Sequence, residues 1–192
     1  MVDEVKESLN GNNMILDIER EFTKEEAKEM TCVMFNVARL RSRPERKLSD
    51  VFRFCIIAVI WIVCAILFFG FFIIRGDRDA LVIAGAILTL ASIVFLMVFA
   101  SRVYQMYDSL MKRGAKHVII KFDENGIDYE EVGSRRFQTT WDTVSFVRAF
   151  ETSIYIFPKE LTGLIYIFEK PRYYEEFKRF LTENNIGVRV VE

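Results

Sequence analysis

Two long uncharged runs dominate the pattern of apolar and polar positions along the chain. The first covers residues 54–74 and the second covers residues 80–101, which makes 21 and 22 residues without a charge. At 1.5 Å per helical residue, each run would span about 30 Å, the thickness of the hydrocarbon core of a bilayer. Two buried core helices are the alternative, but helices that are apolar on all sides are rare outside large proteins. The pattern therefore predicts two transmembrane helices.

The charges around these runs predict how the chain is oriented. The connector at 75–79 has five residues, so the two helices must form an antiparallel hairpin, with both flanking segments on one side. Two arginines lie in the connector, whereas ten lysines and arginines flank the hairpin, which by the positive-inside rule places both termini in the cytoplasm of a multi-pass plasma-membrane protein. The flanking residues that define orientation, and that could also bind lipid headgroups, are Arg39, Arg41, Arg43, Arg46, Lys47, Arg53 and Arg102. We favour orientation alone over headgroup binding as the role of this basic cluster.

The segment before the hairpin, residues 1–53, is expected to hold one strand and one helix. Residues 14–20 are strand-like, and Thr23 with Glu26 forms a capping box, in which each side chain satisfies a backbone amide of the other residue. The helix is then expected over 24–40. Its apolar stripe must pack on the C-terminal domain, a second copy of the chain or the membrane surface, and it consists of Ala27, Met30, Met34 and Val37.

After a helical extension or linker at 102–116, the pattern in residues 117–192 changes to short alternating strands. Asn125-Gly126 predicts a type I′ turn between the first two strands, and Gly133-Ser134 predicts the next turn. Trp141 shares an alternating face with Phe137 and is expected in the core. The strands are expected at 117–123, 127–132, 135–141, 144–150, 154–157 and 164–168.

A helix is expected to close this strand-rich region. Pro171 suits its first turn, and Asn184 marks its end. Its apolar face consists of Tyr173, Phe177, Phe180 and Leu181. Six strands followed by one helix resemble a pleckstrin-homology-like (PH-like) barrel, which uses seven strands. We therefore expect the strand at 14–20 to be the seventh. The expected fold class is a membrane protein of the α+β type, in which a two-helix hairpin is joined to a small antiparallel PH-like barrel with a C-terminal helix.

The chain resembles the YcxB-like proteins of bacterial membranes over nearly its whole length. The likeness is carried by F-D-E-N-G-I at 122–127, by T-T-W-D-T-V at 139–144 and by the aromatic helix at 173–181, together with the strand, capped helix and hairpin that precede them. The resemblance implies a two-helix membrane anchor and a cytoplasmic PH-like domain. It supplies no catalytic residue, because the family is functionally uncharacterised.

Composition excludes several classes of protein. Hydrophobic residues make up 52% of the chain and charged residues 28%, and the formal net charge is −1. These values are not those of a disordered chain or of a globally basic nucleic-acid-binding protein, so no nucleic acid is expected as a partner. The three cysteines, at positions 32, 55 and 64, are too scattered for a disulfide scaffold or a zinc site.

Candidate catalytic residues are few. The only histidine, His117, is expected at an exposed strand end rather than as a general base. Phosphate-binding and nucleophile-elbow motifs are missing from the sequence, so we expect no enzyme, no catalytic or metal site and no cofactor.

The second apolar run contains a stripe of small residues at Gly85, Thr89 and Ser92, which predicts close helix packing within the hairpin or between protomers.

The function that we expect is a membrane-anchored binding or scaffolding module. Its partners would be the lipid bilayer and an unidentified protein, with a homo-oligomer as a further possibility. The alternative is an accessory subunit that docks on another membrane protein through the hairpin. A small oligomeric transporter is disfavoured, because neither apolar run contains an ionisable residue.

Overall fold

The computed structural model describes residues 8–10, 13–75, 80–112, 116–159 and 165–192 of the chain, which divides into two compact units. The sheet unit joins Met1–Leu48 to Ser109–Glu192, and the hairpin unit is Ser49–Asp108. The segments that flank the hairpin in sequence thus form one unit rather than two domains. Two predicted features lie at least partly outside the described residues, namely connector residues 76–79 and residues 113–115 of the helical extension or linker.

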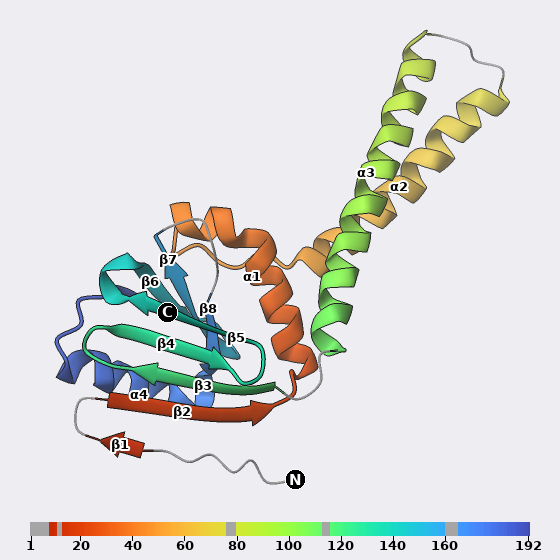
Figure 1. The fold of residues 1–192 in the computed structure, drawn as a ribbon. Helices are drawn as coiled ribbons and strands as arrows, with labels where there is room; N and C mark the ends of the chain where they lie inside the picture. Colours follow the sequence, from red (N-terminus) through yellow and green to blue (C-terminus); the bar gives the residue numbers. More distant parts are fainter. Residues whose placement is uncertain (1–7, 11–12, 76–79, 113–115, 160–164) are drawn as a thin grey trace. The chain divides into compact units, whose positions relative to one another are not determined.

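The hairpin unit contains the two predicted long helices (Figure 1). Helix α2 spans Val51–Ile74, and α3 spans Ala80–Met111. Asp50 explains why α2 begins three residues before the uncharged run, because its Oδ1 accepts hydrogen bonds from the backbone amides of Phe52 (3.0 Å) and Arg53 (3.1 Å). Helix α3 continues past residue 101, as the sequence predicts for the helical extension.

Contacts within the hairpin unit show that α2 and α3 are antiparallel. Residues early in α2 meet residues late in α3, and the reverse holds at the other end. The contacts are edge-to-face ring pairs of Phe52 with Tyr107 (centroids 5.6 Å apart) and Phe54 with Phe99 (5.8 Å), and the approach of Phe69 to Gly85. This arrangement agrees with the predicted hairpin.

The apolar side chains of α2 and α3 are mostly exposed. Trp61 is 73% exposed and Leu88 is 69% exposed, unlike the side chains of a core helix in a soluble protein. Among the described residues, two helices are long and apolar enough to cross a membrane, over Val51–Phe72 and Ile83–Met111. These two spans favour association of the chain with a membrane.

Within the described ranges, the first sheet of the sheet unit contains five antiparallel strands in the order β1-β2-β3-β4-β5 (Figure 1). The strands are β1 (Ser8–Asn10), β2 (Asn13–Arg20), β3 (Lys116–Phe122), β4 (Gly126–Glu131) and β5 (Arg135–Thr140). Strand β2 pairs with β3 from Met14 opposite Phe122 to Arg20 opposite Lys116. This register confirms the predicted pairing across the hairpin. Strand β1, which pairs with β2, was not predicted.

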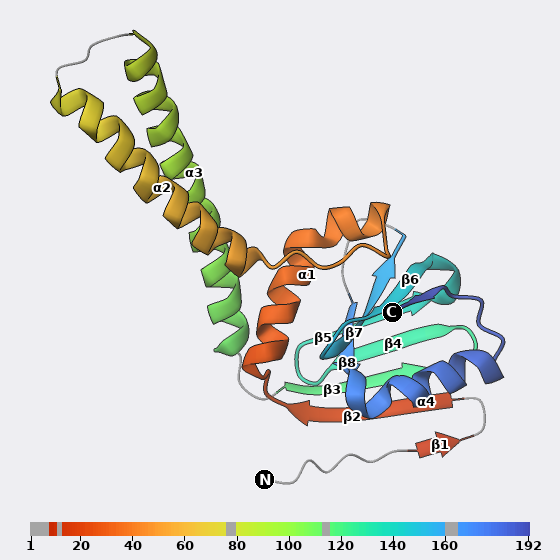
Figure 2. The same ribbon diagram turned by 180° about the vertical axis from the view of Figure 1, so that it is seen from behind.

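The second sheet has the order β8-β7-β6-β9 among the described strands. Figure 2 labels β6, β7 and β8 of this sheet. Its members are β6 (Val144–Ala149), β7 (Ser153–Pro158), β8 (Ile165–Glu169) and β9 (Val190–Val191). The 3₁₀ turn η1 (Trp141–Thr143) links the two sheets. The six strands predicted after the hairpin are therefore present, whereas the parallel partner of β6, strand β9, was not predicted.

Helix α4, Lys170–Glu183, contacts β2, β7 and β8. It covers the larger of two buried apolar clusters, which we call the first core and which includes Ile120, Phe122, Ile154 and Phe177. Pro171 lies in its first turn, and Asn184 is its C-cap, as predicted. Asn185 follows with φ 52°, a left-handed conformation that ends a helix and that Asn tolerates. The predicted aromatic face of α4 is buried and includes one further residue, so that its members are Tyr173, Tyr174, Phe177, Phe180 and Leu181.

Helix α1, Lys24–Ser42, packs on the other face of the second sheet. Its N-terminus has the predicted capping box, with Thr23 and Glu26 bonding each other's backbone amides. The C-terminal domain, to which this sheet belongs, was one of the three packing partners that the sequence left open for this helix. The buried face differs from the predicted stripe, because Met34 is 41% exposed and Val33 is buried. Cys32, Val33 and Met34 are consecutive apolar residues, so periodicity alone did not fix the rotation of the helix.

Strand β7 is buried on both sides as a result. Ile154 and Ile156 face the first core, with α4, while Tyr155 and Phe157 face the second core, with Val33 and Leu40 of α1. Alternate residues of a strand point to opposite faces, so a strand with two covered faces is apolar throughout. This explains the unbroken apolar run at residues 154–157 of β7.

The turn between β3 and β4 differs from the predicted type I′ turn. A type I′ turn needs positive φ at both central residues, and neither Asn125 nor Gly126 has one. Instead, Asp123 Oδ1 accepts hydrogen bonds from the amides of Asn125 (2.7 Å) and Gly126 (2.9 Å). Gly126 is required by space, since a Cβ there would lie 2.2 Å from the Thr139 carbonyl oxygen.

Trp141 fastens this turn to the rest of the sheet unit. Strand β5 ends one residue earlier than predicted, so Trp141 begins η1, but the side chain is buried in the first core as expected. Its indole Nε1 donates to the Asp123 carbonyl (2.8 Å), and its backbone amide donates to the Asn125 carbonyl (3.2 Å). The sequence motifs at 122–127 and 139–144 therefore meet at one structural corner.

We predict that Trp141→Ala lowers the free energy of unfolding of the sheet unit by about 3–5 kcal/mol, the usual cost of deleting a buried aromatic side chain. The measurement is chemical unfolding of the full chain in detergent micelles, followed by near-ultraviolet circular dichroism. Val132→Ala is the matched control, because Val132 is exposed and its truncation should change stability by less than about 0.5 kcal/mol. Equal stabilities of the two variants would contradict the core assignment.

Candidate functional site

The basic cluster is divided between the two units. The five members before residue 48 belong to the sheet unit, and Arg53 and Arg102 belong to the hairpin unit. Of the five cluster members in the sheet unit, four are exposed and Arg41 is partly buried. The exposed ones are Arg39, Arg43, Arg46 and Lys47. We call residues 39–47 the basic segment. It comprises the last turn of α1 and the irregular stretch that follows.

Arg148 of the second sheet and Arg189, which lies just before β9, both contact the basic segment. Arg148 of β6 donates from Nη1 to the carbonyl of Pro44, and Arg189 pairs through Nη2 with the carboxylate of Glu45. Arg148 is only 5% exposed, and its guanidinium lies 4.6 Å from the centre of the Phe150 ring. Burial lowers the pKa of Arg148, because water no longer stabilises its charge. The conformation of the basic segment thus depends on the second sheet.

Glu29 ties the first half of α1 to the same sheet. Its Oε2 accepts a hydrogen bond from the Thr152 amide (2.8 Å), in the turn between β6 and β7. Burial raises the pKa of Glu29, and hydrogen bonds to Thr152 and Tyr155 oppose that rise. Glu29 and Arg148 were not predicted as special residues. The sequence signal for Arg148 is a charge between Val147 and Ala149 in an apolar strand.

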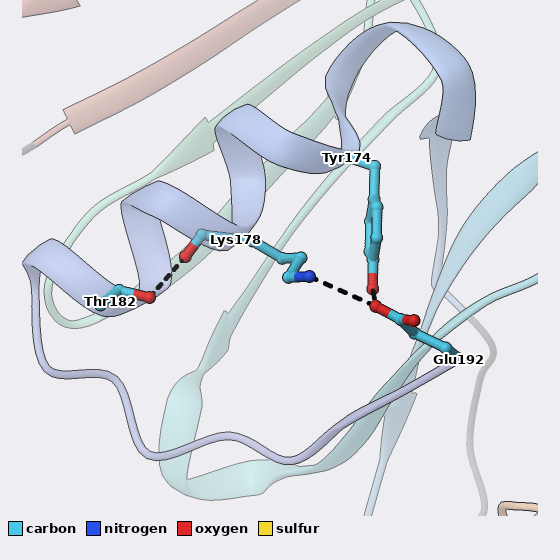
Figure 3. Close-up of polar contacts among 4 residues, drawn as sticks. All are labelled: Tyr174, Lys178, Thr182 and Glu192. Carbon is cyan, nitrogen blue, oxygen red and sulfur yellow. Dashed lines mark hydrogen bonds and ion pairs between the residues drawn. The ribbon is translucent and has the colours of Figure 1, made fainter.

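A second polar cluster joins α4 to the segment after it (Figure 3). The Tyr174 hydroxyl donates to Glu192 Oε1 (2.6 Å), and Lys178 Nζ lies 3.3 Å from the same oxygen. The Lys178 and Lys170 ammonium groups lie 5.0 and 5.5 Å from the centre of the Tyr174 ring. Burial, followed by the bond to the carboxylate, raises the pKa of Tyr174, and these donors lower the pKa of Glu192. We call Tyr174, Lys178 and Lys170 the carboxylate site.

The small-residue stripe of α3 has mixed roles within the hairpin unit. A Cβ at Gly85 would lie 2.5 Å from Phe69 Cε1, so α2 approaches α3 closely at this point. The hydroxyls of Thr89 and Ser92 bond carbonyl oxygens of their own helix, those of Gly85 and Leu88, each at 2.8 Å. Gly85 thus serves contact within the hairpin.

His117 is involved in a contact between strands. Its Nε2 lies 2.6 Å from Asp17 Oδ1 on β2, with both side chains partly exposed. The pair reinforces the β2–β3 ladder, a role that required knowledge of the strand pairing. Over the parts of the chain that the structure describes, no group of three or more His, Cys, Asp or Glu residues could hold a metal ion.

Comparisons of the chain with protein-family models, with curated proteins and with solved structures found no match.

We predict that Glu29→Gln changes how stability depends on pH. Because the folded pKa of Glu29 lies above its ordinary 4.5, its contribution to stability is full below 4.5 and is lost as pH rises through the folded pKa. Glutamine keeps an acceptor for the Thr152 amide and does not ionise. The stability of the native chain relative to Glu29→Gln should therefore fall between acidic and neutral pH. Unfolding of the full chain in micelles, followed by Trp141 fluorescence in a Trp61→Phe background, measures the difference.

The control for this prediction is Met34→Gln, at an exposed position of the same helix, which changes no ionisable group and should leave the pH profile unchanged. Parallel profiles of the native chain and Glu29→Gln would show that the Glu29 carboxylate is not destabilised by burial.

Proposed function

We propose that the chain is a membrane-anchored binding or scaffolding module, with a PH-like sheet unit that faces the cytoplasm. Strands β2–β5 lie in one sheet and β6–β8 in the other, and α4 follows them. With the short additional strands β1 and β9 left aside, this order of seven described strands and one closing helix supports the PH-like assignment and fits membership of the YcxB-like family. The exposed apolar surface of α2 and α3 supports a hairpin that crosses the bilayer.

The observation that carries the proposal is the β2–β3 ladder. It joins the segments before and after the hairpin into one compact unit, so the hairpin is an insertion within the sheet unit rather than a tail attached to it. Two covalent connections therefore tether the sheet unit to its anchor. A domain tethered twice stays close to the membrane surface, which suits a module that presents a binding surface there.

The basic segment supports the cytoplasmic orientation. Its exposed cations lie within twelve residues of the start of α2 at Val51 and are held in the sheet unit by Arg148 and Arg189. Cations this close to a membrane span favour the cytoplasmic side, where anionic lipids attract each by about 1 kcal/mol. The lipid bilayer and a protein partner are the proposed ligands, and self-association is compatible with this arrangement.

The topology can be tested by cysteine labelling with a membrane-impermeant reagent, after the native cysteines are replaced by serine. We expect Gly76→Cys to be labelled in intact cells and Gly187→Cys to be labelled only after lysis. Gly187 is a suitable probe because it is exposed and has open space around its Cα. Labelling of Gly187→Cys in intact cells would overturn the proposed orientation.

Binding through the sheet unit can be separated from docking through the hairpin by co-purification from detergent extracts. The comparison is between the full chain and a variant that keeps only residues 49–108. We expect proteins that co-purify with the full chain to be lost from the hairpin variant. Retention of the same proteins by the hairpin variant would instead favour an accessory subunit that docks within the membrane.

A further inference from the structure

Strand β9 covers the edge of β6 with little hydrogen bonding. It has two residues, Val190 and Val191, and it lies parallel to β6 opposite Val147 and Arg148. The Val147 amide donates to the Arg189 carbonyl at 2.9 Å. The other edge of β6 pairs with β7 over nearly its full length. Of the described pairings of β6, the one with β9 is therefore the easier to open.

The side chains of β9 nevertheless fit their surroundings closely. Val190 packs against the first core, and Val191, which is buried, belongs to the second core. Adjacent residues of one strand thus fill positions on opposite faces of the second sheet. The edge of β6 selects an extended segment with two consecutive aliphatic residues, of which β-branched ones fit best.

The next residue is selected by charge. Glu192 reaches the carboxylate site on α4, where a phenol donates to it at 2.6 Å and an ammonium group lies at 3.3 Å (Figure 3). Lys170 adds a second positive charge that acts on the same carboxylate. The site thus accepts an anionic side chain one position after the aliphatic pair.

The segment that leads to β9 has an irregular backbone. Residues 185–189 have no helical or strand conformation, and Gly187 has open space around it. The ion pair of Arg189 with Glu45 is exposed, and such pairs contribute little stability. Opening of β9 takes Ile186, Val188, Val190 and Val191 out of the two cores, so a partner must supply aliphatic side chains in their place.

We propose that the edge of β6 together with the carboxylate site is a strand-addition site for a partner protein, which the chain's own β9 occupies until it is displaced. The partner supplies an extended segment with two aliphatic residues followed by Asp or Glu. This inference rests on the proposed function, since it names the kind of partner that the binding module takes. Main-chain hydrogen bonds to β6 supply affinity, and the carboxylate supplies specificity.

The test uses the full chain in detergent micelles and a fluorescent peptide with the sequence of residues 186–192, IGVRVVE. Glu192→Gln in the chain releases its own segment from the carboxylate site, so the peptide should bind this variant about tenfold more tightly than it binds the native chain. Fluorescence anisotropy measures the affinity. Thr182→Ala is the matched control, because the Thr182 hydroxyl bonds the Lys178 carbonyl and not Glu192 (Figure 3).

Specificity is tested in the Glu192→Gln chain. A peptide that ends in Gln should bind about tenfold more weakly than the native peptide, and adding Tyr174→Phe should abolish most of this preference. Trp141 fluorescence in a Trp61→Phe background confirms that each variant is folded. Amide exchange at Val147 should be faster in Glu192→Gln than in the native chain, while exchange at Ile156 on β7 stays unchanged.

Several outcomes would overturn the inference. These are equal peptide affinity of the native and Glu192→Gln chains, equal affinity for the Glu and Gln peptides, and unchanged exchange at Val147. Dimerisation of the native chain that excess peptide does not reverse would assign the β6 edge to the β9 segment of a second copy, which also overturns it. Failure of peptide binding with the expected cysteine labelling rejects the strand-addition site and leaves the membrane topology standing.

Discussion

The backbone ladder between β2 and β3 is the constraint on which the rest of the structure depends. It pairs residues that are far apart in sequence, as the contact between Asp17 and His117 across 100 positions illustrates. Closing a flexible loop of this length would cost about 4 kcal/mol in chain entropy. Most of the loop here is two long helices, so far fewer residues have free backbone angles and the entropy cost of closing the loop is smaller. The hairpin thus helps to assemble the sheet unit that it interrupts.

The same pairing determines what α1 covers. Helix α1 follows β2 directly, and it lies on the second sheet, opposite the face that α4 covers. Strand β7 is buried on both faces as a result, and the turn after β6 is fixed by Glu29 through the Thr152 amide. Arg148 and Arg189 extend this contact into the basic segment. Packing of the second sheet and placement of the surface cations are therefore linked.

Local signals in the sequence predicted local structure well. Thr23 and Glu26 specify a helix start through bonds within four residues. Trp141 shares an alternating face with Phe137, and a core position is the simplest one for a large aromatic side chain in such a pattern. The type I′ turn was wrong because Gly126 serves close packing against β5 rather than positive φ.

Features that depend on distant partners were not predictable from the sequence. The side chain of Arg148 is explained only by the carbonyl of Pro44, and Glu192 only by Tyr174 and Lys178. Strand β9 has two residues, too few for a pattern of alternation. The strand-like segment at 14–20 was the exception, because an unpaired strand needs a partner and the hairpin returns the chain to the same side.

Because β2 and β3 are far apart in sequence, the order in which the ribosome makes them matters for folding. At about 5–20 residues per second, a ribosome releases β3 roughly 5–20 seconds after β2. During that interval one edge of β2 has no partner, and the apolar face of α1 around Val33 and Leu40 has no sheet to cover. In the proposed arrangement, both helices of the hairpin leave the ribosome before the sheet can close. Slow membrane insertion would therefore prolong the time in which a nascent chain can pair wrongly with its neighbours.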